Sequence, residues 1–96
     1  MQLPALVTNY ADNVATAVRS LTRGETISIE IGRNPVDVVL LSDIPFGHKL
    51  AIIDIESGEK IVKYGETIGQ STASIRQGEH VHVHNVAGLR GRGDIT

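Results

Sequence analysis

Cysteine is absent from this chain of 96 residues, and aromatic residues make up only 3% of it. Without thiols the chain can form neither a disulfide nor a thiolate metal site, and cysteine-based catalysis is excluded. With so few rings, the core has to be filled by Val, Ile, Leu and Ala, and an excess of β-branched side chains favours strands. The length fits one domain with a thin hydrophobic core.

An excess of charge and a long apolar run are missing as well. Nine Lys and Arg residues stand against eleven Asp and Glu residues, for a formal net charge of -2. This balance lacks the basic surface that nucleic-acid-binding domains need. No run is long enough for a transmembrane helix, and the N-terminus lacks the basic start and apolar stretch of a secretory signal. We therefore expect a cytoplasmic protein that binds neither nucleic acid nor a membrane.

Apolar spacing near the N-terminus predicts one short helix. Val14, Val18 and Leu21 recur at the interval of a single helical face. Asn9 or Asp12 is suited to cap the start of such a helix, because a side-chain oxygen can accept from free backbone N–H groups. We therefore predict a helix over residues 12–21.

The rest of the pattern predicts a mostly β domain. Residues 27–31 alternate as a half-buried strand does, residues 32–35 carry a turn signal, and residues 36–41 form an apolar run that predicts a buried strand. Further short strands are expected at residues 50–53, 60–63, 67–70 and 79–84. Because the pattern then ends, we predict one domain over residues 1–86 and a flexible, basic, glycine-rich tail over residues 87–96.

One short phrase recurs in the chain: an apolar residue, two variable residues, Gly-Glu, one variable residue and a second apolar residue. Three copies occur, at residues 21–27 (LTRGETI), 55–61 (IESGEKI) and 75–81 (IRQGEHV). Glycine supplies a backbone shape that other residues resist, so the phrase is interpreted as a structural turn. A fourth copy, at residues 44–50 (IPFGHKL), has His48 in place of Glu, followed by Lys49. His48 is therefore either a functional departure or a surface histidine without a task.

Three histidines alternate along the last predicted strand. His80, His82 and His84 would share one face, with neighbours about 7 Å apart. They are weak candidates for metal ligands, because three collinear side chains rarely close on one ion. A polar strand face with the intervening valines buried is one alternative. A site for a carboxylate substrate, or a site completed by another chain, is a second. Asn85 ends the strand with donor and acceptor capacity, and Lys63 brings an ammonium that can help to hold an anion.

Several segments together resemble the SAF domain at the N-terminus of altronate and galactarate dehydratases. They are residues 47–52 (GHKLAI), 54–59 (DIESGE), 63–69 (KYGETIG) and 78–85 (GEHVHVHN), and residues 12–18 (DNVATAV) are similar to the helix that opens that domain. The resemblance covers roughly residues 10–86, and the order and spacing of the segments make it specific. It implies the β-clip fold, a small all-β unit shared with the antifreeze-like domain of sialic acid synthases.

The resemblance also implies a function. In fused members the domain precedes a large catalytic domain, and in split members, such as the sulfolactate sulfo-lyases, it is a separate small subunit. The reaction is a β-elimination, in which a proton leaves next to a carboxylate and water or sulfite departs. The chain is therefore expected to be a non-autonomous subunit of a hydroxy-acid or sugar-acid lyase. It would hold no cofactor itself, while a large catalytic partner carries a divalent metal, commonly iron.

An elimination needs a base, a clamp for the carboxylate and help for the leaving group. His48 and His82 are the candidates for acid–base catalysis, because imidazole changes charge near neutral pH. The candidates for substrate binding, at the seam with the large subunit, are His48, Lys49, Lys63, His82, His84 and Asn85. We expect His48 to approach the face of His82 and His84 although they are distant in the chain. A stand-alone module that binds a sugar acid or a protein is the alternative function, and homo-oligomerisation is left open.

Overall fold

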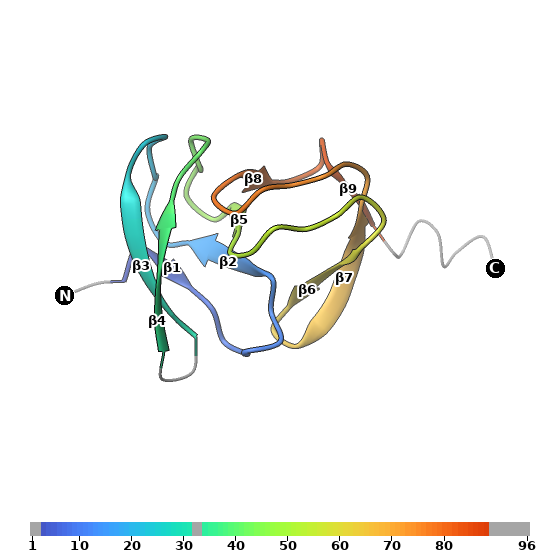
Figure 1. Cartoon of the computed structure of the whole chain (residues 1–96), viewed down its shortest axis with the longest axis horizontal. Coiled ribbons are helices and arrows are strands. Elements are labelled where there is room, and N and C mark those ends of the chain that lie inside the picture. The colour runs from blue at the N-terminus through green and yellow to red at the C-terminus, as the bar shows by residue number, and fades with distance from the viewer. Residues whose placement is uncertain (1–2, 32–33, 89–96) are drawn as a thin grey trace.

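The computed structural model describes residues 3–31 and 34–88, and this part of the chain forms nine short strands (Figure 1). The strands are β1 (Ala5–Leu6), β2 (Val14–Ala17), β3 (Thr26–Ile31), β4 (Asn34–Val39), β5 (Lys49–Ala51), β6 (Lys60–Lys63), β7 (Glu66–Ser71), β8 (His80–Val81) and β9 (Val86–Gly88). The described residues contain no helix, so none of them forms a helical membrane span. The predicted mostly β domain is confirmed.

The predicted helix over residues 12–21 is wrong, because β2 lies in this segment. β2 pairs antiparallel with β1 on one side and with β5 on the other. Val14 packs in one hydrophobic cluster and Ala15 and Ala17 pack in another, so apolar residues are needed on both faces of the strand. A strand buried on both faces has no simple alternation, and Val14 together with Val18 and Leu21, which lie beyond the strand, matched the helical interval.

The strands form three antiparallel units. β1, β2, β5 and β8 make the central sheet, β3 and β4 make a hairpin at one end, and β6, β7 and β9 make a sheet at the other end (Figure 1). β6 lies where the sequence predicts it, whereas β4 is not the predicted buried strand: Val38 is buried but Val39 is 53% exposed. The β3–β4 pairing already includes Asn34 and Pro35, so both belong to β4 and not to the predicted turn.

The end of the domain also differs from the sequence prediction. The predicted strand over residues 79–84 is limited to β8, since the chain turns after Val81. It then resumes as β9, which pairs with β7, so the β structure continues through Gly88. Ala87 and Gly88 therefore belong to a strand and not to the predicted tail, whose remaining residues, 89–96, lie outside the described part.

The four copies of the turn phrase associate in two pairs. Leu21 forms a bridge with Ile44, and Ile55 forms a bridge with Ile75, each through two backbone hydrogen bonds. The glycines of all four copies, Gly24, Gly47, Gly58 and Gly78, have φ between 82° and 94°. Each pair of anchors lies in its own hydrophobic cluster, so the domain has two small cores joined by the central sheet.

Candidate functional site

The glutamate of the turn phrase holds the turn closed. The carboxylates of Glu25, Glu59 and Glu79 accept hydrogen bonds from the backbone N–H three residues earlier, at N···O distances of 2.8 to 3.2 Å. In the fourth copy the corresponding residue is Pro45, which has no N–H to be held. A glutamate at position 48 would therefore have no backbone N–H at position 45 from which to accept a hydrogen bond, and His48 stands in its place. Its side chain is free of this structural task.

The backbone of His48 is nevertheless fixed by the sheet. Its carbonyl accepts from the N–H of Ala17 at 2.8 Å, and its N–H donates to the carbonyl of Pro45 at 3.0 Å. β5 begins at the next residue and pairs with β8 in the register Lys49↔Val81. Continuing this register by one pair places His48 opposite His82. The turn and the strand pairing together carry the imidazole to the segment that follows β8.

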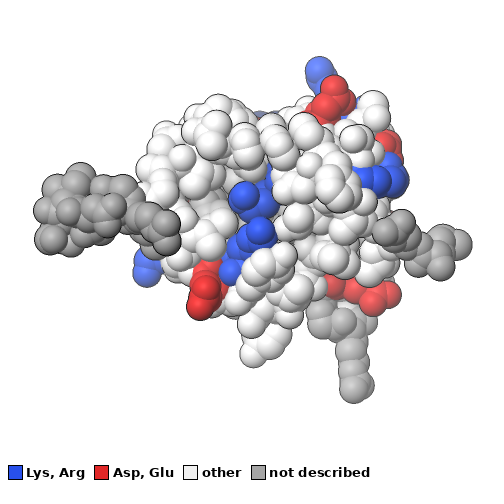
Figure 2. All heavy atoms as spheres, turned by 180° about the vertical axis from the view of Figure 1, so that it is seen from behind, with Lys and Arg blue, Asp and Glu red and all other residues white. Residues whose placement is uncertain are grey.

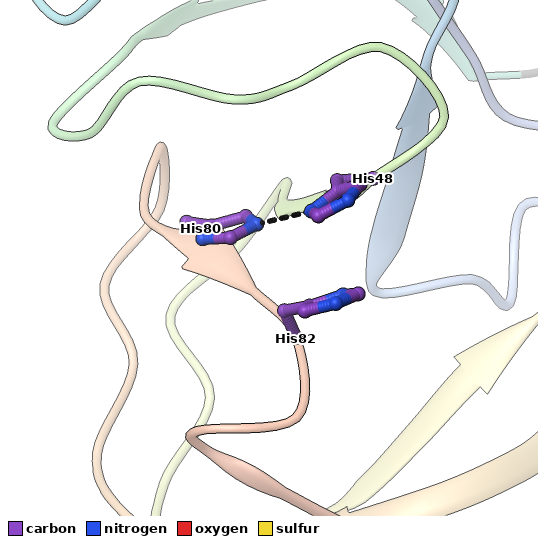
Figure 3. A group of neighbouring side chains, drawn as sticks. All are labelled: His48, His80 and His82. Atoms are coloured by element: carbon purple, nitrogen blue, oxygen red, sulfur yellow. Dashed lines mark hydrogen bonds between the residues drawn. The ribbon is translucent and has the colours of Figure 1, made fainter.

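Three imidazole rings gather at this place (Figure 3). His48 and His80 lie edge to edge, with Nδ1 of His48 and Nε2 of His80 2.8 Å apart and joined by a hydrogen bond. His82 stacks beneath His48, with a centroid distance of 3.9 Å and planes 16° apart. One ring nitrogen from each of the three lies within 4.8 Å of the others, and all three side chains are half-buried. The predicted approach of His48 to His82 is confirmed.

His84 and Asn85 take different positions from the three clustered rings. The His84 ring lies tilted beside His80, at a centroid distance of 5.2 Å, and it is exposed. Asn85 is 6% exposed, and its amide is used by the backbone: Nδ2 donates to the carbonyl of His80, and Oδ1 accepts from the N–H of His82. Asn85 thus fixes the segment that bears two of the imidazoles.

A shallow cleft of about 230 Å³ opens beside the imidazoles, and Lys49, Ile68, His82, Val83, Val86 and Gly88 line it. Burial, and then the charge of Lys63, lower the pKa of Lys49. The Lys63 ammonium lies 4.8 Å from the centre of the Tyr64 ring. Among the described residues neither lysine is in an ion pair, since the one ion pair there joins Arg19 and Glu25.

Basic side chains also gather in a hollow at the middle of one face of the molecule (Figure 2).

His80 and His82 are held toward their neutral form, because the pKa of each is lowered. Burial, followed by the charges of the neighbouring histidines and Lys49, lowers the pKa of His80. The pKa of His82 is lowered by partial desolvation first and then by His48, Lys49 and His84. A neutral imidazole offers one lone pair and one N–H. The cluster therefore presents hydrogen-bonding and metal-ligating nitrogens beside an ammonium that has no counterion in the part of the chain that the structure describes.

Comparison with known proteins identifies the domain. A family model of the altronate/galactarate dehydratase SAF domain matches residues 4–89. The chain belongs to this family. The altronate dehydratase of Escherichia coli (strain K12) is 42% identical to this SAF domain over 74 residues, which are 77% of the chain and 14% of that protein. The (2R)-sulfolactate sulfo-lyase subunit alpha of Chromohalobacter salexigens is 63% identical over 43 residues, which are 45% of the chain and 46% of that subunit.

The chain thus spans a small part of the altronate dehydratase and about half of the sulfo-lyase subunit that it matches. The predicted family membership is confirmed. The galactarate dehydratase (L-threo-forming) of Escherichia coli (strain K12) is a further relative, 39% identical over 49 residues, which are 51% of this SAF domain and 9% of that enzyme. The similarities place the domain among parts of dehydratases and sulfo-lyases.

Sequence reasoning placed the metal candidates on one strand, at His80, His82 and His84. The structure groups nitrogens of His80 and His82 with His48, while the His84 ring lies beside His80 and outside that group. The three histidines do not lie on one straight strand, because the chain turns after Val81. Val83 is 81% exposed, so the alternative of a strand with both intervening valines buried is wrong. Pro45 was the signal that sequence reasoning missed, because its missing N–H already distinguishes the fourth turn.

Proposed function

We propose that this SAF domain is the small component of a hydroxy-acid lyase and binds the carboxylate of the acid in the cleft beside Lys49. The observation that carries the proposal is the half-buried ammonium of Lys49, without a counterion among the described residues, beside His82 in a domain of the altronate/galactarate dehydratase family. A desolvated cation next to a second cation, Lys63, gains most from an incoming anion. A carboxylate would supply the missing charge and accept a charge-assisted hydrogen bond from Lys49 Nζ.

The imidazoles suit the remaining polar groups of such an acid. His82 lines the cleft, and a neutral ring can donate to one hydroxyl and accept from another. Its ring stacks on His48, which is itself hydrogen-bonded to His80, so an acid bound here would face an oriented set of nitrogens. His48 and His82 are thereby the candidates to move a proton at the departing oxygen or sulfur.

The cleft alone is too open to exclude water, which an elimination from a hydroxy acid requires. Phe46, two residues before His48, is 69% exposed, and Val83, which follows His82, exposes its apolar side chain at the cleft. Exposed apolar side chains beside a polar site are typical of a surface that another protein covers. We therefore expect a large catalytic partner to close the cleft and to carry a divalent metal, with iron as the expected ion, that polarises the acid.

Binding of the acid can be tested on the chain alone. Altronate, galactarate and (2R)-sulfolactate would each be titrated into the isotope-labelled protein, with chemical shifts followed by NMR. We expect at least one acid to shift the signals of Lys49 and His82, and the Lys49→Gln variant to lose this response. Lys60→Gln is the matched control, because Lys60 is exposed on β6 and its loss removes the same charge. Equal responses of the two variants would remove Lys49 from the site.

The subunit role needs a second experiment. The chain, a large catalytic subunit of the family, and both together would be assayed with the same three acids. We expect turnover only with both, and a His48→Ala/His82→Ala pair should lower it while the subunits stay associated. Turnover by the chain alone would show a complete enzyme. Full activity of the double variant in the complex would leave the domain with a structural role only.

A further inference from the structure

Three imidazoles place a ring nitrogen each within 4.8 Å of the others, although the one hydrogen bond among them needs only two rings. His48 Nδ1 and His80 Nε2 are 2.8 Å apart, and a nitrogen of His82 lies within 4.8 Å of both. Two nitrogen ligands at about 2.1 Å from one ion are about 3.4 Å apart in tetrahedral geometry and about 3.0 Å apart at a right angle. The first two nitrogens are therefore a few tenths of an ångström closer than adjacent ligands on a metal, and a small movement apart would let them share an ion.

We propose that His48, His80 and His82 bind one divalent transition-metal ion on this chain, with His48 Nδ1 and His80 Nε2 as two of its three ligands. The site would be additional to a metal on the large partner, and it is a property of the chain alone that does not depend on the proposed function. Imidazole nitrogen suits zinc, iron, nickel and copper, whereas magnesium and calcium prefer oxygen ligands. Three protein ligands would leave coordination positions open, as catalytic sites do.

The ligands are carried by a rigid frame. His48 leads into β5 and His80 lies in β8, and these strands pair directly, so the two ring carriers are fixed relative to each other. Asn85 holds the segment after β8 through the carbonyl of His80 and the N–H of His82. Pro45 frees His48 from the turn. Frames that fix their ligands lower the entropic cost of binding an ion.

Binding also requires two local adjustments. In the stack, the in-plane lone pairs of His48 and His82 lie side by side, so the His82 ring has to turn about its side-chain bonds to point at a shared ion. His82 lines the open cleft and is only half-buried, so this turn involves a partly solvent-exposed side chain. The proton in the His48–His80 hydrogen bond has to move to the other nitrogen of the ring that carries it. A neutral ring makes this change by tautomerisation, with no net loss of a proton.

The test is isothermal titration of the full chain, without a histidine tag, with Zn²⁺ and with Co²⁺ at neutral pH. We expect one equivalent to bind. The variants His48→Ala and His80→Ala should each weaken binding by at least about tenfold, since ligand loss should cost no less than loss of a supporting contact. His84→Ala is the matched control. His84 also lies against His80, but it is exposed and outside the group of three, so this variant should bind within about twofold of the unchanged protein.

Imidazole ¹⁵N chemical shifts would give a readout independent of affinity. Zinc should move the ring signals of His48, His80 and His82, and His84 should move least. Amide spectra of each variant would show that the fold is intact. Absence of binding by the folded protein would overturn the proposal. So would a His84→Ala variant that loses as much affinity as His48→Ala, because the ion would then sit on the ladder of His80, His82 and His84.

Discussion

Pro45 removes the backbone N–H that a glutamate at position 48 would hold, so Pro45 and His48 are two halves of one change in the fourth turn. In the other copies the glutamate carboxylate accepts from that N–H, as Glu25 does from Thr22 at 2.8 Å. The pair Pro-His therefore exchanges a local hydrogen bond for an imidazole that faces His80 and His82. His48 thus joins the site while the turn keeps the backbone path of the other copies, since Gly47 has a φ of 82°.

Restoring the structural turn should couple these two positions. His48→Glu in the otherwise unchanged protein adds a carboxylate with no donor, whereas Pro45→Thr/His48→Glu supplies both partners. We expect a favourable coupling of about 1 kcal/mol in a double-mutant cycle of unfolding free energies, the size of one net hydrogen bond. The measurement is urea unfolding of the unchanged protein, Pro45→Thr, His48→Glu and the double variant. A coupling of zero would mean that Pro45 and His48 are independent.

The glutamates of the regular turns should matter for stability although they lie at the surface. Glu59→Ala removes the acceptor of the Glu56 N–H, and we expect a loss of about 1 kcal/mol of unfolding free energy. Glu56→Ala is the control, because it removes the same charge from an exposed neighbour in the same turn and leaves the bond in place. Chemical denaturation would compare the two. Equal losses would show that charge, and not the hydrogen bond, is responsible.

Stability should depend on pH through the imidazoles. Burial lowers the pKa of His80 below its ordinary value of 6.5, so the unfolded chain binds protons more readily than the folded one. The stabilising difference is complete above about pH 6.5 and is lost as the pH falls below it. The hydrogen bond from Arg19 lowers the pKa of Glu25 below 4.5, which places the contribution of that pair at more acidic pH.

We therefore expect the unfolding free energy to fall between pH 7.5 and pH 5.5, and to fall less in His80→Gln. The measurement is urea unfolding at each pH in the presence of EDTA, so that no metal contributes. His82→Gln should likewise reduce the fall of the unfolding free energy with pH, since the pKa of His82 is also lowered. A variant that combines His80→Gln and His82→Gln and keeps the full pH dependence would show that other groups cause it.

Loss of the Asn85 amide should both destabilise the domain and disturb the imidazoles. Asn85→Ala leaves the His80 carbonyl and the His82 N–H without their partner in a largely buried place. We expect a loss of about 2 kcal/mol, together with faster hydrogen exchange at the His82 amide. Asn34→Ala, at an exposed position in β4, should change neither quantity. An Asn85→Ala protein with unchanged exchange at His82 would show that other contacts hold this segment.

Local patterns in the sequence predicted what local physics decides. The strand at residues 27–31 and the boundaries of β6 were confirmed, and so was the repeated turn, because glycine with positive φ between apolar anchors needs no distant contact. β2 was mistaken for a helix because hydrophobic clusters on both of its faces bury its residues. That burial depends on pairings between distant segments, which periodicity does not reveal.

In the site as well, the sequence predicted the local feature and not the contact between distant segments. The exchange of Glu for His48 was visible in the sequence and gave the correct neighbourhood, since the ring meets His82. The hydrogen bond between His48 and His80 was not predictable, because it depends on the register of β5 against β8. The evenly spaced histidines suggested a straight strand, but the segment bends where Asn85 binds its backbone.

The pairing of the four turns has a consequence for how the domain folds. His48 belongs to the turn pair around Ile44, and His80 belongs to the pair around Ile55 and Ile75, so each half can close without bringing the rings together. The imidazoles meet only when β5 joins β8 across the seam between the halves. Contacts between distant segments tend to be slow to form. The ring stack is thus an internal reporter of this long-range closure, and its signals in refolding experiments would show when β5 and β8 have paired.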